Sequence, residues 1–202
     1  MIAPLRSITY CLFLSLLLTA CGSSPPVRYF SLSSTVVSGA QNPAEAVVLG
    51  LGPMRMAKYL DRSQLVTRGA GAEIQVDEFN RWAEPLSVAF LRVVATDVDN
   101  MLDGVTVLVF PWESVTRAQV NYRLLGEVSR FDADDSGSVV LETQWGIVAM
   151  DSDEWLLRPR RTRYEAQTGA PGDPAAIASA MNEALARFSG DIASQMQTLL
   201  QQ

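Results

Sequence analysis

Val47-Val48-Leu49-Gly50-Leu51-Gly52 is an uninterrupted apolar run that ends at Gly52-Pro53. A short apolar run bounded by glycine and proline predicts a strand that is buried on both faces. A second apolar run, Thr106 to Phe110, is closed by Pro111-Trp112 and predicts another strand of this kind. These two runs form the centre from which the rest of the fold is predicted.

Two segments have helical periodicity. The first begins near Pro85, which suits a first helical turn, and ends by Gly104, a residue that often stops a helix. The second is opened by Asp173-Pro174, an acidic cap followed by proline at the first helical position. Each has one apolar face. The predicted core positions are Leu86, Phe90, Val93, Val94, Val98 and Met101 in the first helix, and Ile177, Met181, Leu185, Phe188, Ile192 and Met196 in the second.

The remaining periodic segments predict strands. Residues 28–32 read as a first strand, and residues 64–67 and 73–77 as a hairpin around Gly69-Ala70-Gly71. Three later strands are predicted over residues 120–129, 139–147 and 155–167. The first two alternate apolar and polar residues and the third follows a turn, as is typical of antiparallel strands. The sequence therefore predicts one compact α/β domain over residues 28–202, a mixed sheet with two long helices packed on it and antiparallel hairpins in its second half.

The first 27 residues have a different organisation. A cationic start containing Arg6 and an apolar core from Ile8 to Leu18 have the shape of a secretory signal, and this core is too short to span a bilayer. Leu18-Thr19-Ala20-Cys21 resembles the lipobox of bacterial lipoproteins. We predict a signal peptide over residues 1–20 and a lipidated tether over residues 21–27. The alternative is an ordinary secretory signal with a chance cysteine.

The lipobox implies that Cys21 carries covalent diacylglyceryl and N-acyl groups. More than one buried chain, at roughly 0.8 kcal/mol per methylene, gives stable membrane attachment. In enterobacterial lipoproteins an aspartate at the second mature position retains the protein at the inner membrane. Gly22 occupies that position here, so we expect the outer membrane, with the domain on its periplasmic face.

Composition excludes several classes of function. The chain has a net charge of −6, and removing residues 1–20 discards only one cation, so nucleic acid is not expected as a partner. It has no histidine, which removes His-based nucleophile systems and the usual His/Cys zinc sites. Its two cysteines are Cys11 in the signal and Cys21. We therefore predict no enzyme activity, no bound cofactor and no metal.

The segment most similar to a metal-binding motif is an acidic turn from Asp132 to Gly137. Asp132, Asp134 and Ser136 fit the early ligand positions of a calcium loop. Position twelve, where a calcium loop requires an acid, is occupied by Thr143. We interpret the segment as a solvated hairpin turn, with a calcium site as the alternative. Glu78 and Glu84 flank Arg81-Trp82, and we interpret them as local salt links rather than an acid/base pair.

Two groups of residues are candidate partner contacts. The first is a dense basic patch on a strand whose Pro159 indicates a sheet edge; it consists of Arg158, Arg160, Arg161 and Arg163. Alternation predicts the first two on one face and the last two on the other. The patch either prevents unwanted edge pairing or docks an acidic partner or phosphate head groups. The second group is Trp82 and Trp112, which stand at the ends of elements and are either packed inside or interface anchors.

Several of these segments carry a resemblance to a family. Tyr29 to Leu32, Leu60 to Arg68, Phe79 to Leu86 and Pro111-Trp112 look like the corresponding segments of the PqiC-type ABC-transport auxiliary lipoproteins, which are also described as membrane-integrity-associated transporter subunits. The resemblance extends over essentially the whole body after Cys21. One departure is Ser63, where the family often has proline.

The resemblance implies a non-enzymatic outer-membrane lipoprotein with an α/β body. Relatives work with MCE-domain proteins, which form tubes or rings across the periplasm for lipid traffic between the two membranes. A homo-oligomeric ring at the outer-membrane end of such a conduit is the assembly that the family implies. The alternative functions are a lipid carrier that itself holds an acyl chain in an apolar cavity, and a purely structural envelope lipoprotein.

Overall fold

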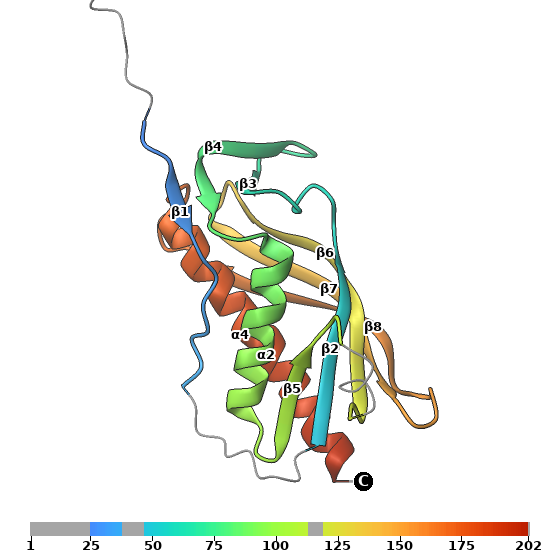
Figure 1. Cartoon of the computed structure of the whole chain (residues 1–202). Coiled ribbons are helices and arrows are strands. Elements are labelled where there is room, and N and C mark those ends of the chain that lie inside the picture. The colour runs from blue at the N-terminus through green and yellow to red at the C-terminus, as the bar shows by residue number, and fades with distance from the viewer. Residues whose placement is uncertain (1–24, 38–46, 113–118, 202) are drawn as a thin grey trace, which may run out of the picture.

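The structure, a computed structural model, describes residues 25–37, 47–112 and 119–201. This part of the chain forms a single mixed sheet and two helices (Figure 1). The elements in chain order are β1 (Arg28–Phe30), β2 (Val47–Met56), β3 (Gln64–Arg68), β4 (Ile74–Trp82), α2 (Leu86–Met101), β5 (Val105–Val109), β6 (Tyr122–Asp134), β7 (Ser138–Ala149), β8 (Trp155–Gln167) and α4 (Pro174–Leu200). The predicted α/β fold, with its mixed sheet and two long helices, is confirmed.

Strand β6 lies at the centre of the sheet. One side of β6 pairs with β7 in antiparallel fashion along most of its length, and β7 pairs in turn with β8. The other side forks: its first half pairs in parallel with β2, which continues to β5, and its last two residues pair in parallel with β3, which continues to β4 and β1. β8 therefore forms an edge of the sheet, as Pro159 predicted.

The apolar run in β2 is buried as its pattern predicted. Leu49 and Leu51 are at most 1% exposed, and parallel neighbours flank the strand on both sides. Gly50 has a specific reason to be glycine: a Cβ built there would lie 2.6 Å from the ring of Trp112. The indole of Trp112 therefore packs directly on the backbone of β2.

Helices α2 and α4 pack on the same side of the sheet (Figure 1). All the predicted core positions of α4, and those of α2 except the half-buried Met101, are at most 3% exposed. Phe188 of α4 lies at the centre of this layer, with its ring within 6 Å of the rings of Phe90, Trp145 and Tyr164. Asp173 caps α4 as predicted, because its carboxylate accepts hydrogen bonds from the amides of Ala175 and Ala176.

The hairpins also follow the sequence prediction, with one correction. β3 and β4 form the predicted hairpin, although β4 continues to Trp82. The β6–β7 turn is where the acidic segment predicted it, and Asp134 holds it by accepting hydrogen bonds from Ser136 and Ser138. Asp132, however, is not solvated: it lies inside β6 with no exposed surface.

Several sequence predictions lie outside the described residues. These are the signal peptide over residues 1–20, the lipidated Cys21 with the first part of the tether over residues 21–27, and the loop around Asn42-Pro43. They stay predictions. Among the described residues, neither helix combines the length and the apolar character that crossing a bilayer requires.

Candidate docking surface

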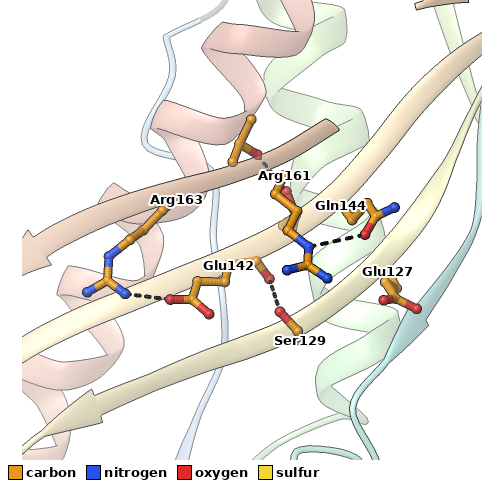
Figure 2. A pocket seen from close by; sticks show the side chains of 8 residues that line it. Glu127, Ser129, Glu142, Gln144, Arg161 and Arg163 are labelled. Atoms are coloured by element: carbon orange, nitrogen blue, oxygen red, sulfur yellow. Dashed lines mark hydrogen bonds and ion pairs between the residues drawn. The ribbon is translucent and has the colours of Figure 1, made fainter. Parts of the chain in front are cut away.

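The face of the sheet opposite the helices, which we call the open face, carries a polar hollow of about 470 Å³. Figure 2 shows its side chains projecting from three neighbouring strands, with the helices behind the sheet. Apart from Thr143 and Thr162, they come in pairs two residues apart, as side chains on one face of a strand must. The pairs are Glu127 and Ser129 on β6, Glu142 and Gln144 on β7, and Arg161 and Arg163 on β8.

A second hollow of about 450 Å³ adjoins the first and shares Glu127 and Gln144 with it. Apart from Arg55 and Gly126, its other lining residues are apolar: Pro53, Leu125, Trp155 and Pro159. Trp155 is 39% exposed and lies over Gly146, where an added Cβ would come within 2.7 Å of the indole. We call the two hollows together the open-face groove. It has a charged end and an apolar end.

The charges in the groove are unequally satisfied. Arg163 forms ion pairs with Glu142 and with Glu165, the latter at 2.6 Å, and these hydrogen bonds, that with Glu165 first, raise its pKa. The side chain of Arg161 makes a single hydrogen bond in the described part of the chain, from Nε to Gln144 Oε1 at 3.4 Å (Figure 2). Arg161 therefore has donors left for a partner. Arg55, which lines the second hollow, is a further exposed cation and makes one ion pair, with Glu127 at 3.1 Å.

Arg160 points away from the groove. It lies on the helix side of β8, where its guanidinium hydrogen-bonds Asp191 of α4 at 2.9 and 3.1 Å and lies 5.2 Å from the centre of the Trp145 ring. Alternation had predicted Arg158 on the same face as Arg160. The register shift between Trp145 and Ile147 instead places Arg158 in an irregular stretch of β8, and its side chain is exposed. The structure thus divides the basic patch between two environments.

The two tryptophans predicted as partner contacts are largely occupied by internal packing. Trp82 is 4% exposed and belongs to the hydrophobic core, so the packing alternative replaces the contact prediction for this residue. Trp112 is half-buried: its ring covers Gly50, its Nε1 donates to the carbonyl of Leu108 at 3.2 Å, and Phe110 lies edge-on at 5.3 Å. Only an outer part of Trp112 is available to a partner.

The most exposed indole of the groove, Trp155, was not among the predicted contacts. It begins β8 immediately after the turn at Asp151-Ser152-Asp153. This is the same signal that selected Trp82 and Trp112, a tryptophan at the end of an element. Its neighbour Leu156 is 41% exposed. If every tryptophan at the end of a predicted element had been taken as a candidate contact, Trp155 would have been among them.

The acids considered for chemistry have structural partners. Asp132 accepts hydrogen bonds from Arg68, Arg130 and Tyr59, the last at 2.7 Å, and burial together with this carboxylate raises the pKa of Tyr59. Glu78 pairs with Arg81 at 3.7 Å, as predicted. Within the described residues, His, Cys, Asp and Glu form no cluster of three that could hold a metal. The arrangement on the open face is suited to binding an extended segment with apolar and polar groups.

The chain belongs to the family of ABC-type transport auxiliary lipoprotein components, whose model matches residues 30–193. The matched region runs from the end of β1 into the last turns of α4, so it includes β2 to β8, all of α2, most of α4 and the whole open-face groove. No curated protein is significantly similar to the chain.

Two solved structures share the fold. One is the crystal structure of an uncharacterised protein, with a TM-score of 0.69 and 18% identity, covering 85% of this chain and 99% of its own. The other is the crystal structure of a DUF330 protein from Xanthomonas campestris, with a TM-score of 0.67 and 18% identity, covering 87% of this chain and 100% of its own. At this identity the likeness extends to the fold alone.

Proposed function

We propose that this protein is anchored by lipid to the periplasmic face of the outer membrane and docks the MCE-domain conduit of an intermembrane lipid transport system. In this role it supports membrane integrity and catalyses no reaction. The observation that carries the proposal is the family match over residues 30–193 directly downstream of the lipobox that ends at Cys21. Gly22 supports the outer rather than the inner membrane.

The open-face groove is the surface that we assign to the conduit. Trp155 supplies exposed apolar area, and an exposed indole is the type of side chain that anchors interfaces. Arg161, with unused donors on the same face, fits an acidic residue of the partner. Arg55 lines the groove as a second exposed cation, and Arg158 is exposed on the neighbouring stretch of β8. The expected partner segment therefore has an apolar residue close to a carboxylate.

A ring of identical copies is part of the proposal. The outer edge of β8 and the edges at β5 and β1 leave backbone groups without strand neighbours in the described part of the chain, and unpaired edges favour association with further strands. Native mass spectrometry of the detergent-solubilised protein is expected to give one defined multimer. A monomer at micromolar concentration would contradict the ring. The docking proposal does not depend on this result and is tested by the pull-down below.

The decisive experiment is an affinity pull-down of the full-length lipidated protein from detergent-solubilised envelopes, with Cys21→Ala as the unlipidated control. We expect an MCE-domain protein in the eluate of the lipidated form. Trp155→Ala combined with Arg161→Ala is expected to abolish its recovery. Val88→Ala, which removes a 53% exposed apolar side chain from α2, is expected to leave recovery unchanged. Recovery of phospholipid without any MCE-domain protein would instead support the lipid-carrier alternative.

A further inference from the structure

Three apolar side chains are exposed where the domain meets its tether: Val27, Tyr29 and Phe79, at 42%, 66% and 39% exposure. β1 pairs in parallel with β4, with Tyr29 opposite Arg81. Side chains two residues apart share a face of a strand, so Val27, directly before β1, lies on the face of Tyr29. Phe79 is next to Asn80, the β4 partner of Arg28, in the irregular stretch of β4 before Arg81. The three exposed side chains therefore lie close together along the paired ends of β1 and β4, and we call them the tether-proximal patch.

The patch is held in place by the fold. The carboxylate of Asp77 accepts hydrogen bonds from the amides of Phe79 and Asn80, both at 2.9 Å, which fixes the backbone that presents the Phe79 ring. Arg81 is tied to Glu78 by its Nε, which donates to the carbonyl of that residue at 3.1 Å. Exposed rings on a fixed backbone lose little conformational freedom when a partner covers them.

Chain length indicates what covers the patch. Val27 follows the predicted lipid-bearing Cys21 by six residues, and a fully extended chain spans at most about 3.5 Å per residue, or about 21 Å in all. A tether of this length keeps the patch within about 21 Å of the lipid-bearing residue, close enough for the patch to reach the head-group layer. Tethering at this length gives an effective concentration in the millimolar range, which makes even a small apolar contact productive.

The chemistry of the patch also fits a lipid surface. Tyr is enriched at membrane–water interfaces, Phe is common on the apolar side of interfacial segments, and arginine keeps its charge among the head groups. Arg81 faces the same way as Tyr29, its partner across β1 and β4, and is the cation of the patch, whereas Arg28 faces the other way and its guanidinium lies 5.1 Å from the centre of the Phe30 ring. The net negative charge of the chain does not oppose this contact, because the covalent lipid provides the attachment.

We propose that Val27, Tyr29 and Phe79 insert into the interfacial layer of the leaflet that holds the acyl groups of Cys21. The inference rests on the lipid anchor of the proposed function and goes beyond it, because it gives the domain an orientation. Figure 1 shows the β7–β8 turn, in orange, at the opposite end of the molecule from β1, in blue. Trp155, which follows that turn, is thereby directed away from the membrane and toward the periplasm.

The test uses full-length lipidated protein in phospholipid vesicles. Apart from Cys21, residues 21–202 contain no cysteine, so a single introduced cysteine can carry a nitroxide label. Electron paramagnetic resonance then compares how strongly oxygen and a water-soluble nickel chelate relax the label. We expect the ratio of oxygen to nickel collisions to be several-fold higher for Val27→Cys than for Leu156→Cys, whose position is equally exposed but distal.

The same label distinguishes insertion from mere closeness to the anchor. Adding Tyr29→Ser and Phe79→Ser to Val27→Cys is expected to lower the ratio to the value at position 156, whereas adding Val88→Ser is expected to change nothing. An unchanged ratio in the double variant would overturn the proposal. Strong spin–spin broadening between labels shielded from both reagents would also overturn it, in favour of a second copy of this chain on the patch.

Intact mass of each labelled protein separates the two levels of inference. A mass without acyl groups would refute the anchor, and with it the proposed localisation. A correct lipidated mass together with an aqueous label at position 27 would refute the patch alone and leave the anchor and the docking proposal standing. The pull-down experiment changes residues of the open-face groove and none of the patch, so its result does not depend on this test.

Discussion

Arg160 of β8 donates from one terminal nitrogen to both carboxylate oxygens of Asp191 of α4, at 2.9 and 3.1 Å. The same carboxylate accepts a hydrogen bond of 2.7 Å from the hydroxyl of Tyr164, and the guanidinium lies over the buried ring of Trp145. This contact ties an edge strand to the helix layer. Arg160 therefore belongs to the framework of the domain, whereas its neighbour Arg161 faces the open-face groove.

This relationship predicts opposite consequences for two adjacent arginines. We expect Arg160→Ala to lower the free energy of unfolding by about 1 kcal/mol, a modest value because the arginine side chain is 39% exposed. Arg161→Ala is expected to change it by less than about 0.5 kcal/mol, as is usual at a surface site. Urea unfolding of both variants measures the difference. Equal effects would mean that the division of the basic patch between two faces is incorrect.

A buried ionic cluster is expected to be the most sensitive polar site. Asp132 is fully buried and holds Arg68 at 3.1 Å and Arg130 at 2.9 Å. Asp132→Asn keeps the shape of the side chain but leaves two arginines without their carboxylate, so we expect a loss of about 3–5 kcal/mol. Thermal unfolding gives the measurement. Glu127→Gln is the matched control, because its partner Arg55 is 82% exposed, and a similar loss in both variants would contradict this account.

The contrast between Asp132 and Asp134 shows what the sequence could and could not predict. Local patterns identified the elements correctly: the run from Val47 to Gly52 became a buried strand, and the stripe of α4 became its core face. An acidic residue in a polar run, however, carries no local sign that distant arginines will bury it. The pairing of Asp132 with Arg68 joins residues 64 positions apart and depends on β3 meeting the end of β6.

The open-face groove was only partly predictable for the same reason. Arg161 and Arg163 were correctly placed together by the alternation of a strand. The irregular pairing around Arg158 broke the alternation on which the prediction for Arg158 and Arg160 depended. The apolar end joins Pro53 of β2 to Trp155 of β8 across two intervening strands, and no local pattern contains that neighbourhood.

The cap of α4 offers a test of a local prediction. Asp173 accepts hydrogen bonds from the amides of Ala175 and Ala176, at 3.4 and 3.2 Å. Asp173→Ala leaves these donors to water, and we expect it to cost about 1 kcal/mol of unfolding free energy. Asp173→Asn retains an acceptor and should lose less than half as much. Chemical denaturation distinguishes the two variants, and equal losses would show that charge rather than capping is responsible.

Asp97 gives the domain a pH-dependent term. It lies on α2 with no exposed surface and accepts a hydrogen bond of 3.1 Å from Ser189 of α4. Burial raises its pKa above the ordinary value of 3.8, and hydrogen bonds from Ser34 and Ser189 only partly oppose this. The folded state therefore binds the proton more tightly than the unfolded state. The resulting stability is fully present below pH 3.8 and is lost as the pH rises through the pKa of the folded state.

Asp97→Asn removes this loss, since an amide stays neutral at every pH. We expect the variant to gain stability over the natural protein as the pH is raised from about 4 to 8, because each unit of pKa shift corresponds to about 1.4 kcal/mol. Urea unfolding at intervals across this range gives the difference curve. Ser189→Ala removes a hydrogen bond to the ionised carboxylate of Asp97. In this variant we expect the loss of stability to extend to higher pH than in the natural protein. A flat difference curve would mean that Asp97 has the same pKa in both states, and the buried carboxylate would then be ionised at the interface between the two helices.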